Sequence, residues 1–130
     1  MAAPHPRPLS PHLSIWRWGP HMMASILHRV SGSGLATVGL GVLTWWLYAL
    51  AKGGEAFSDF QAAASHPLGL FVLIGLSWAF FQHLLSGMRH LVMDSGATFE
   101  LGLNKTLAVV VMVGALLLTA LSWAYILGAR

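Results

Sequence analysis

The sequence contains no cysteine. This absence excludes disulfides, thiolate metal sites and cysteine-ligated iron–sulfur clusters on this chain. Charged residues make up only 8% of the 130 residues, although a soluble domain of this size needs a larger charged surface. The seven lysines and arginines are scattered, without a basic cluster interleaved with aromatic residues. We therefore expect no nucleic-acid partner.

The sequence also lacks a recognisable targeting segment. Residues 1–20 are rich in proline and contain no long apolar run, unlike a secretory signal peptide, and proline and aromatic residues fit a transit peptide poorly. We therefore expect the chain to be complete from Met1. There is no Ser/His/Asp triad, no phosphate-binding glycine loop and no flavin-binding pattern, so we expect no catalytic centre of these kinds on this chain alone.

Apolar residues dominate what is present. Hydrophobic residues make up 56% of the chain, and the mean hydropathy is +0.69. Three stretches, at about residues 20–50, 68–93 and 106–127, have roughly the 20 apolar residues that cross a ~30 Å hydrocarbon layer. The sequence thus predicts an all-α membrane protein with three transmembrane helices, forming a single domain over residues 1–130 without room for a soluble domain.

The segments between the spans are predicted from their polar and capping residues. Residues 1–19 form a cytoplasmic or interfacial segment, either a short helix beginning at Ser10-Pro11 or a disordered tail. Residues 51–67 are predicted as a polar loop that closes on Ser65-His66-Pro67 as a helix start. A second loop follows the second span, and Asn104 is expected to cap the third helix.

The distribution of basic residues predicts the orientation in the membrane. Three arginines lie on the N-terminal side and two basic residues in the second loop, against two basic residues on the opposite side. By the positive-inside rule, the N-terminus is cytoplasmic, or on the equivalent matrix side, and the C-terminus is outside. The residues counted are Arg7, Arg17, Arg29, Arg89 and Lys105 on one side, and Lys52 and Arg130 on the other.

The second span carries a stripe of ionisable residues. His83, Gly87, His90 and Asp94 are spaced i, i+4, i+7 and i+11, which places them on one helix face. Ionisable groups at membrane depth are costly, so they usually face a partner, a cofactor or water. Gly87, one turn from His83, leaves open space beside the imidazole, as a flat cofactor would need.

The first span begins with a second polar group, formed by Ser25, His28 and Arg29. Because consecutive spans are antiparallel, this group should meet the C-terminal end of the second span at one membrane face. One face of this span changes from polar to small residues along its length, which is typical of a face that packs closely against other helices. The residues of this face are Ser25, Arg29, Gly32, Ala36 and Gly39.

Haem ligation is one interpretation of the deep histidine. His83 could be an axial haem ligand, a proton-relay group or a polar group that hydrogen-bonds a neighbouring helix. Haem b needs an apolar slot, an imidazole and cations near its propionates, which His28, Arg29 and His90 would supply. His66 belongs to the opposite rim, so a bis-histidine haem would need its second ligand from another chain.

The remaining polar residues also have two interpretations each. Ser25 and Arg29 suit a quinone carbonyl, whereas the alternatives are a helix-packing serine and an arginine that anchors the helix at the interface. Asp94 could deliver protons to a quinone pocket. Alternatively, it could be a helix-end carboxylate paired with Arg89 or Lys105.

Two motifs make the chain resemble a known family, the cytochrome b membrane-anchor subunit of succinate dehydrogenase, respiratory complex II. The first motif begins with Arg7-Pro8-Leu9 and Ser10-Pro11-His12-Leu13 and ends in Ser25-Ile26-Leu27-His28-Arg29-Val30-Ser31. The second is His83, then Gly87-Met88-Arg89-His90, Met93-Asp94 and Gly96. The resemblance covers nearly the whole chain, although the third span matches only in being apolar.

The resemblance implies partners, cofactors and residue roles. Family members anchor a flavoprotein and an iron–sulfur subunit together with a second small anchor chain, in a haem-binding helical bundle. By resemblance His83 is an axial ligand of haem b and the second anchor supplies the other ligand. The remaining roles are ubiquinone binding by Ser25 and Arg29, contact with the haem propionates or edge by His28, Arg29 and His90, and a position near the quinone pocket for Asp94.

We therefore expect a haem b-bearing, quinone-binding anchor of succinate:ubiquinone oxidoreductase, with no succinate-oxidising centre on this chain. One alternative is a fumarate reductase anchor. Another, from a different class, is a haem-free proton relay or transport subunit that uses His83, His90 and Asp94. The missing transit peptide favours a bacterial inner membrane over an imported mitochondrial subunit.

Overall fold

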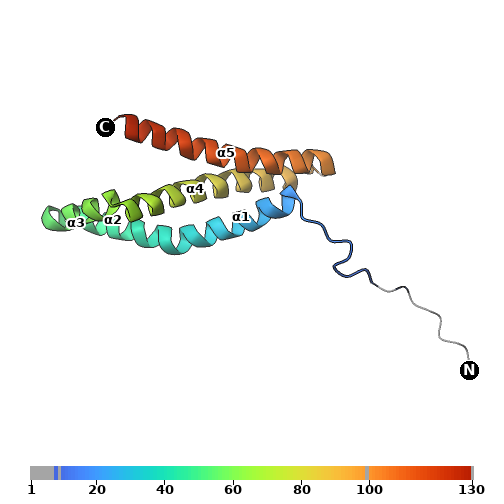
Figure 1. The fold of residues 1–130 in the computed structure, drawn as a ribbon, viewed down its shortest axis with the longest axis horizontal. Coiled ribbons are helices and arrows are strands. Elements are labelled where there is room, and N and C mark those ends of the chain that lie inside the picture. The colour runs from blue at the N-terminus through green and yellow to red at the C-terminus, as the bar shows by residue number, and fades with distance from the viewer. Residues whose placement is uncertain (1–7, 9, 99, 130) are drawn as a thin grey trace, which may run out of the picture.

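A computed structural model describes Pro8 and residues 10–98 and 100–129, and the regular structure in these ranges is helical (Figure 1). Arg7 and Leu9 of the first motif, and Arg130, lie outside the described residues. The elements in chain order are α1 (Pro20–Gly34), the π-helical turn η1 (Leu35–Gly39), α2 (Leu40–Lys52), α3 (Gly54–Ser65), α4 (Pro67–Asp94) and α5 (Leu101–Gly128).

Among the residues that the structure describes, three helical segments are long and apolar enough to span a membrane. They are Pro20–Lys52, which joins α1, η1 and α2, then Pro67–Asp94 and Leu101–Gly128. Their most apolar windows have mean hydropathies of 1.5, 1.8 and 2.3. The prediction of an all-α, multi-pass membrane protein with three spans is confirmed.

The helices pack through small residues and turn their large apolar side chains outward. The buried apolar residues are Ala24, Ala49, Ala79, Ala108, Val111 and Ala115. By contrast, Phe71 is 74% exposed and Leu121 is 66% exposed. This arrangement suits lipid, where tails solvate large side chains and close backbone approach supplies the helix–helix attraction.

Helix α4 is the centre of the bundle (Figure 1). It contacts α1, η1, α3 and α5, and α1 also contacts α5. At the other end of the molecule, α3 folds back against α2 and α4. The C-terminal half of α4 is therefore enclosed by α1 and α5, and this is where the ionisable stripe lies.

The prediction of a polar loop over residues 51–67 is wrong, because most of this segment forms α3. Gly53 and Gly54 turn the chain with φ of +62° and +53°, a left-handed conformation that glycine adopts readily. Alanine-rich sequence then favours helix. Phe60 packs edge-on against Trp45 of α2, with ring centroids 5.1 Å apart. This cross-helix contact is not visible in the local sequence.

The predicted start of the second span is confirmed, and that of the third is corrected. His66 is the N-cap of α4, and its Nδ1 accepts a hydrogen bond from the Leu68 N–H at 3.3 Å. Helix α5 begins at Leu101 rather than near residue 106, and its N-cap is Glu100. Asn104 therefore lies inside the helix, where its side chain is committed to a tertiary contact.

The chain before α1 contains a turn, and residues 10–19 form no helix. The Ser14 N–H donates to the Pro11 carbonyl at 2.9 Å, and the rings of Trp16 and Trp18 meet edge-on at 5.2 Å. The short interfacial helix is thus not found in this segment, which extends away from the bundle (Figure 1).

The first span is bent near η1 (Figure 1). Within this turn the Leu40 N–H donates to the Leu35 carbonyl, five residues back. The Thr37 hydroxyl also bonds the Ser33 carbonyl at 2.8 Å. Such π-turns widen a helix locally and are frequent at functional sites. Here the widened turn faces α4, since a Cβ on Gly39 would contact Leu76 at 3.5 Å.

We predict that Ala115→Leu destabilises the bundle by about 1–3 kcal/mol, because Ala115 is completely buried and the larger side chain would overpack the helix interface. The measurement is unfolding of the full chain in detergent. Ala120→Leu is the matched control, since Ala120 is exposed on the same helix. Equal stability of the two variants would contradict the packing assignment.

Candidate functional site

Two contacts with α1 hold the His83 side chain in place, one made by ring stacking and one by a ring nitrogen. Its Nδ1 lies 3.1 Å from the backbone carbonyl oxygen of His28, and the two imidazoles stack with centroids 4.1 Å apart and planes 6° apart. Since a carbonyl oxygen can only accept, Nδ1 carries the proton and donates it. The lone pair of the neutral ring is therefore on Nε2.

His90 completes a cluster of three histidines. Its ring centroid lies 5.2 Å from that of His28, with the rings tilted by 59°. His28 lies on α1, whereas His83 and His90 lie on α4, and all three are half-buried. The predicted meeting of the start of the first span with the end of the second is confirmed for these residues. His28 contacts His83 directly.

The glycine that makes room for His83 is Gly32, not Gly87. A Cβ on Gly32 would lie 2.7 Å from His83 Cε1. A Cβ on Gly87 would lie 3.9 Å from His28 Cε1, so Gly87 faces the other imidazole of the stack. The expectation of open space beside His83 at Gly87 is thus corrected, because a stripe on one helix does not reveal what the facing helix inserts.

An open apolar groove of about 790 Å³ runs from His83 along η1, between the first span and α4. His83 is the ionisable residue of its lining, and the first span contributes both small and large apolar residues. The lining consists of Gly32, Leu35, Ala36, Gly39, Leu40, Val42, Leu43, Trp46, Phe60, Leu73, Leu76 and His83. Such a groove can hold a flat, largely apolar group beside an imidazole.

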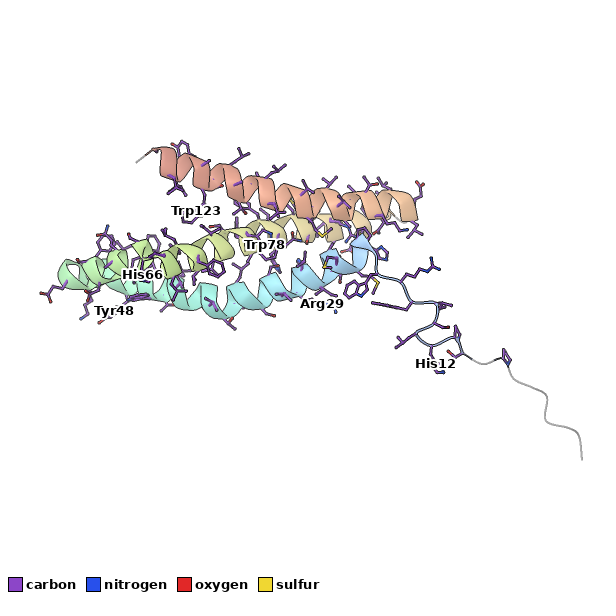
Figure 2. The ribbon with its side chains drawn as sticks, in the orientation of Figure 1. His12, Arg29, Tyr48, His66, Trp78 and Trp123 are labelled. Carbon is purple, nitrogen blue, oxygen red and sulfur yellow. The ribbon has the colours of Figure 1, made fainter. Side chains whose placement is uncertain are left out.

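Ser25 and Arg29 lie on α1 one turn apart, as predicted. Ser25 is half-buried and Arg29 is exposed. Figure 2 labels Arg29 on α1. His28, the neighbour of Arg29 in sequence, turns toward α4 and the histidine cluster. The guanidinium is thus available to a group outside this chain, whereas the imidazole is engaged within it.

Arg89 and Asp94 do not share an environment. Asp94 is exposed on the last turn of α4. Arg89 is only 6% exposed, and its Nη2 donates to Asn104 Oδ1 of α5. The Asn104 Nδ2 in turn donates to the Thr98 carbonyl at 3.4 Å. Arg89, counted above as a loop cation, is therefore a buried group that joins α4 to α5.

Sequence reasoning missed a second polar stripe on α4. Gln82, Ser86 and Arg89 are all buried, and the Gln82 Nε2 donates to Ser86 Oγ at 3.0 Å. Their spacing of i, i+4 and i+7 inside an apolar span is the signal that could have revealed a buried polar face.

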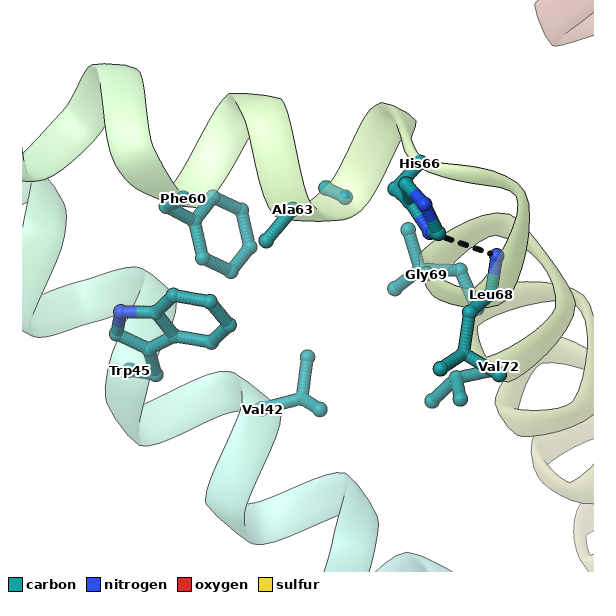
Figure 3. Close-up of a pocket in the computed structure, with 10 residues that line it drawn as sticks. Val42, Trp45, Phe60, Ala63, His66, Leu68, Gly69 and Val72 are labelled. Atoms are coloured by element: carbon teal, nitrogen blue, oxygen red, sulfur yellow. Dashed lines mark hydrogen bonds between the residues drawn. The ribbon is translucent and has the colours of Figure 1, made fainter.

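A second apolar cavity, of about 370 Å³, lies between α2, α3 and α4 at the opposite end of the molecule (Figure 3). Trp45, Phe60 and His66 contribute to its lining. His66 begins α4, roughly 25 Å along the helix from His83 at ~1.5 Å per residue. This cavity shares Val42, Phe60 and Leu73 with the groove that begins at His83. His66 lies at the end away from the histidine cluster, as expected.

Fold and site together define a multi-pass helical membrane protein with an imidazole cluster between its first two spans. The family model described as succinate dehydrogenase/fumarate reductase transmembrane subunit matches residues 3–122. The chain belongs to this family.

Relatives of the same family are found in bacteria and in mitochondria. The succinate dehydrogenase cytochrome b556 subunit of Paracoccus denitrificans is 39% identical over 95 residues, covering 73% of this chain and 72% of that protein. The protein of that name from Rickettsia felis is 37% identical over 117 residues, 90% of each chain. The mitochondrial cytochrome b560 subunit of Sus scrofa is 36% identical over 94 residues, 69% of this chain and 54% of that protein.

We predict that Asn104→Leu destabilises the chain by about 1–3 kcal/mol, because it removes the hydrogen-bond acceptor of a buried guanidinium. Thermal unfolding in detergent measures the effect. Lys105→Leu is the control, since Lys105 is exposed and next in sequence. If both variants unfold at the same temperature, the contact between Arg89 and Asn104 does not stabilise the corner between α4 and α5.

Proposed function

We propose that this chain is a membrane-anchor cytochrome b subunit of succinate:ubiquinone oxidoreductase that ligates haem b through His83. The observation that carries the proposal is the hydrogen bond from His83 Nδ1 to the His28 carbonyl. Ligating histidines almost always donate their other ring N–H to a carbonyl, carboxylate or water, which fixes the tautomer and the ring orientation. The bond leaves Nε2 of His83 to act as the ligand.

The residues around His83 suit haem b. The apolar groove beside the imidazole provides space for a flat macrocycle, and the absence of a side chain at Gly32 avoids a collision with the imidazole ring of His83. When bound, haem b supplies a one-electron redox centre. His28, Arg29 and His90 are the proposed partners of its propionates and edge, because the two imidazoles contact each other at this end of α4 and the exposed guanidinium of Arg29 follows His28 in sequence.

The second axial ligand is proposed to come from a second small anchor subunit. His66 lies at the opposite end of α4, and the ring of His28 is stacked on that of His83. The relatives are named as subunits of succinate dehydrogenase. Since this chain has no cysteine for clusters, we propose that a flavoprotein and an iron–sulfur subunit supply its electrons.

Ubiquinone is the proposed substrate, bound by Ser25 and Arg29. An exposed guanidinium and a half-buried hydroxyl, one helical turn apart, can donate hydrogen bonds to a quinone carbonyl. A permanent positive charge stabilises the negative charge that a quinone oxygen gains as electrons arrive and before it is protonated. Asp94, exposed at the end of α4, is the proposed group for proton delivery.

The proposed location is a bacterial inner membrane with the N-terminus in the cytoplasm. Bacterial relatives support the location. The orientation rests on the positive-inside rule, because Arg17, Arg29 and Lys105 lie at the end of the bundle where α1 and α5 begin. The quinone site would then be near the cytoplasmic face.

Two other functions are each favoured by one specific observation. The family description includes fumarate reductase, so the chain could anchor an enzyme working in the opposite direction. The contact between His28 and His90 is also what a haem-free proton relay would need. A reduced-minus-oxidised visible spectrum of the purified complex separates a relay from a cytochrome, since a relay subunit has no b-type band.

We predict that His83→Ala lowers haem retention severalfold or converts the low-spin spectrum to high-spin, because one axial imidazole is lost. The measurement is the reduced-minus-oxidised spectrum of the purified complex, normalised to protein. His66→Ala is the control at the opposite end of α4 and should leave the spectrum unchanged. An unchanged low-spin spectrum in His83→Ala would assign the ligand elsewhere.

We predict that Arg29→Leu lowers quinone reduction roughly ten- to a hundredfold, because a charged hydrogen bond of ~1.5–3 kcal/mol is lost. Electron transfer from succinate to a soluble dye should stay near normal, since it does not require the quinone. Ser25→Ala should also lower quinone reduction more than dye reduction, but by a smaller factor. Lys52→Leu, at the opposite end of the span, should lower neither activity. A proportional loss of both activities in Arg29→Leu would make Arg29 an anchor only.

A further inference from the structure

We propose that Ser31 and Gly32 are positioning residues that set the strength of the bond between His83 and the His28 carbonyl, and through it the reduction potential of the haem. This inference rests on the proposed function, since it takes His83 as the axial ligand. It gives a role to the buried hydroxyl of Ser31 and to Gly32, neither of which takes part in the proposed quinone and propionate contacts.

The first observation is that two side-chain donors share the carbonyl oxygen of His28. The Ser31 hydroxyl donates to the His28 carbonyl oxygen at 3.0 Å, and His83 Nδ1 donates to the same oxygen at 3.1 Å. Ser31 is 2% exposed, so water does not compete for its hydroxyl. This carbonyl lies inside α1, where it also takes the backbone hydrogen bond of the helix, so a second side-chain donor withdraws electron density from the bond to His83.

The second observation is the close approach at Gly32. This residue follows His28 by four positions on α1, so it lies on the same helix face. A Cβ at Gly32 would lie 2.7 Å from Cε1 and 3.0 Å from Nδ1 of His83. Only a residue without a side chain lets the imidazole reach the carbonyl at hydrogen-bond distance.

The chemical consequence concerns electron donation from His83. A stronger bond from Nδ1–H to the carbonyl gives the imidazole more imidazolate character and makes Nε2 a better donor. A more basic axial ligand favours the ferric over the ferrous state, and this lowers the haem potential. Ser31 weakens the bond by competition and so holds the potential up, whereas Gly32 permits the bond to form.

The test of Ser31 is a redox titration of the b-type absorbance in the intact complex. Ser31→Ala should shift the equilibrium about threefold toward the oxidised haem, a fall of about 30 mV at ~59 mV per tenfold for one electron. Ser33→Ala is the matched control, because Ser33 is exposed on the same helix. A potential in Ser31→Ala equal to that of the control, or higher, would overturn the role of Ser31.

The test of Gly32 is haem content and spin state in the same complex. Gly32→Ala should lower haem retention or the low-spin fraction severalfold, because the added methyl group displaces the imidazole from the carbonyl. Gly34→Ala is the matched control, since a Cβ there meets nothing within 4 Å. Identical spectra and haem content in the two variants would overturn the role of Gly32.

These outcomes are distinguishable from failure of the proposed function. A complex without a b-type band, or a His83→Ala variant with an unchanged spectrum, overturns haem ligation by His83 itself. If haem is present and depends on His83, but Ser31→Ala and Gly32→Ala behave like their controls, the positioning inference alone is overturned.

Discussion

The contact between α1 and α4 at the His28 carbonyl is the interaction on which the rest of the site depends. The His28 carbonyl oxygen fixes the tautomer of His83. The imidazole of His83 can approach this oxygen only because Gly32 has no side chain, and the approach stacks the rings of His83 and His28. The apolar groove then opens along the same seam. A hydrogen bond between spans has few competitors in hydrocarbon, so a single contact can determine the orientation of the His83 imidazole.

The lack of competing hydrogen-bond partners in hydrocarbon also governs the other polar groups of the bundle. Large apolar side chains face outward and alanines occupy the interfaces, while the buried Gln82 donates to Ser86 and the buried Thr119 donates to the Ala115 carbonyl. Arg89 is the most demanding case, because a buried guanidinium without an acceptor is costly, and Asn104 of α5 provides that acceptor. Arg29 on α1 remains exposed and free to act on a group outside the chain. Two arginines near the same end of the bundle therefore have different physical roles.

The sequence predicted the three spans and the helix start at His66, because hydropathy and N-terminal capping are local properties. It failed at α3, where glutamate and aspartate suggested a loop although Phe60 packs on Trp45. It also failed at Asn104, a good cap residue whose side chain is instead used by Arg89. In both places a contact with a distant segment outweighed the local preference.

The sequence by itself determined which residues are chemically available, since histidine spacing on a helix sets which side chains share a face. It also determined that the start of the first span meets the end of the second, because consecutive spans are antiparallel. Only the tertiary structure decided which glycine faces His83, which ring nitrogen carries the proton and which arginine is buried. These features depend on how one helix is rotated and shifted against another. Side-chain packing across the interface sets that rotation and register, and the residue spacing within a single helix does not reveal it.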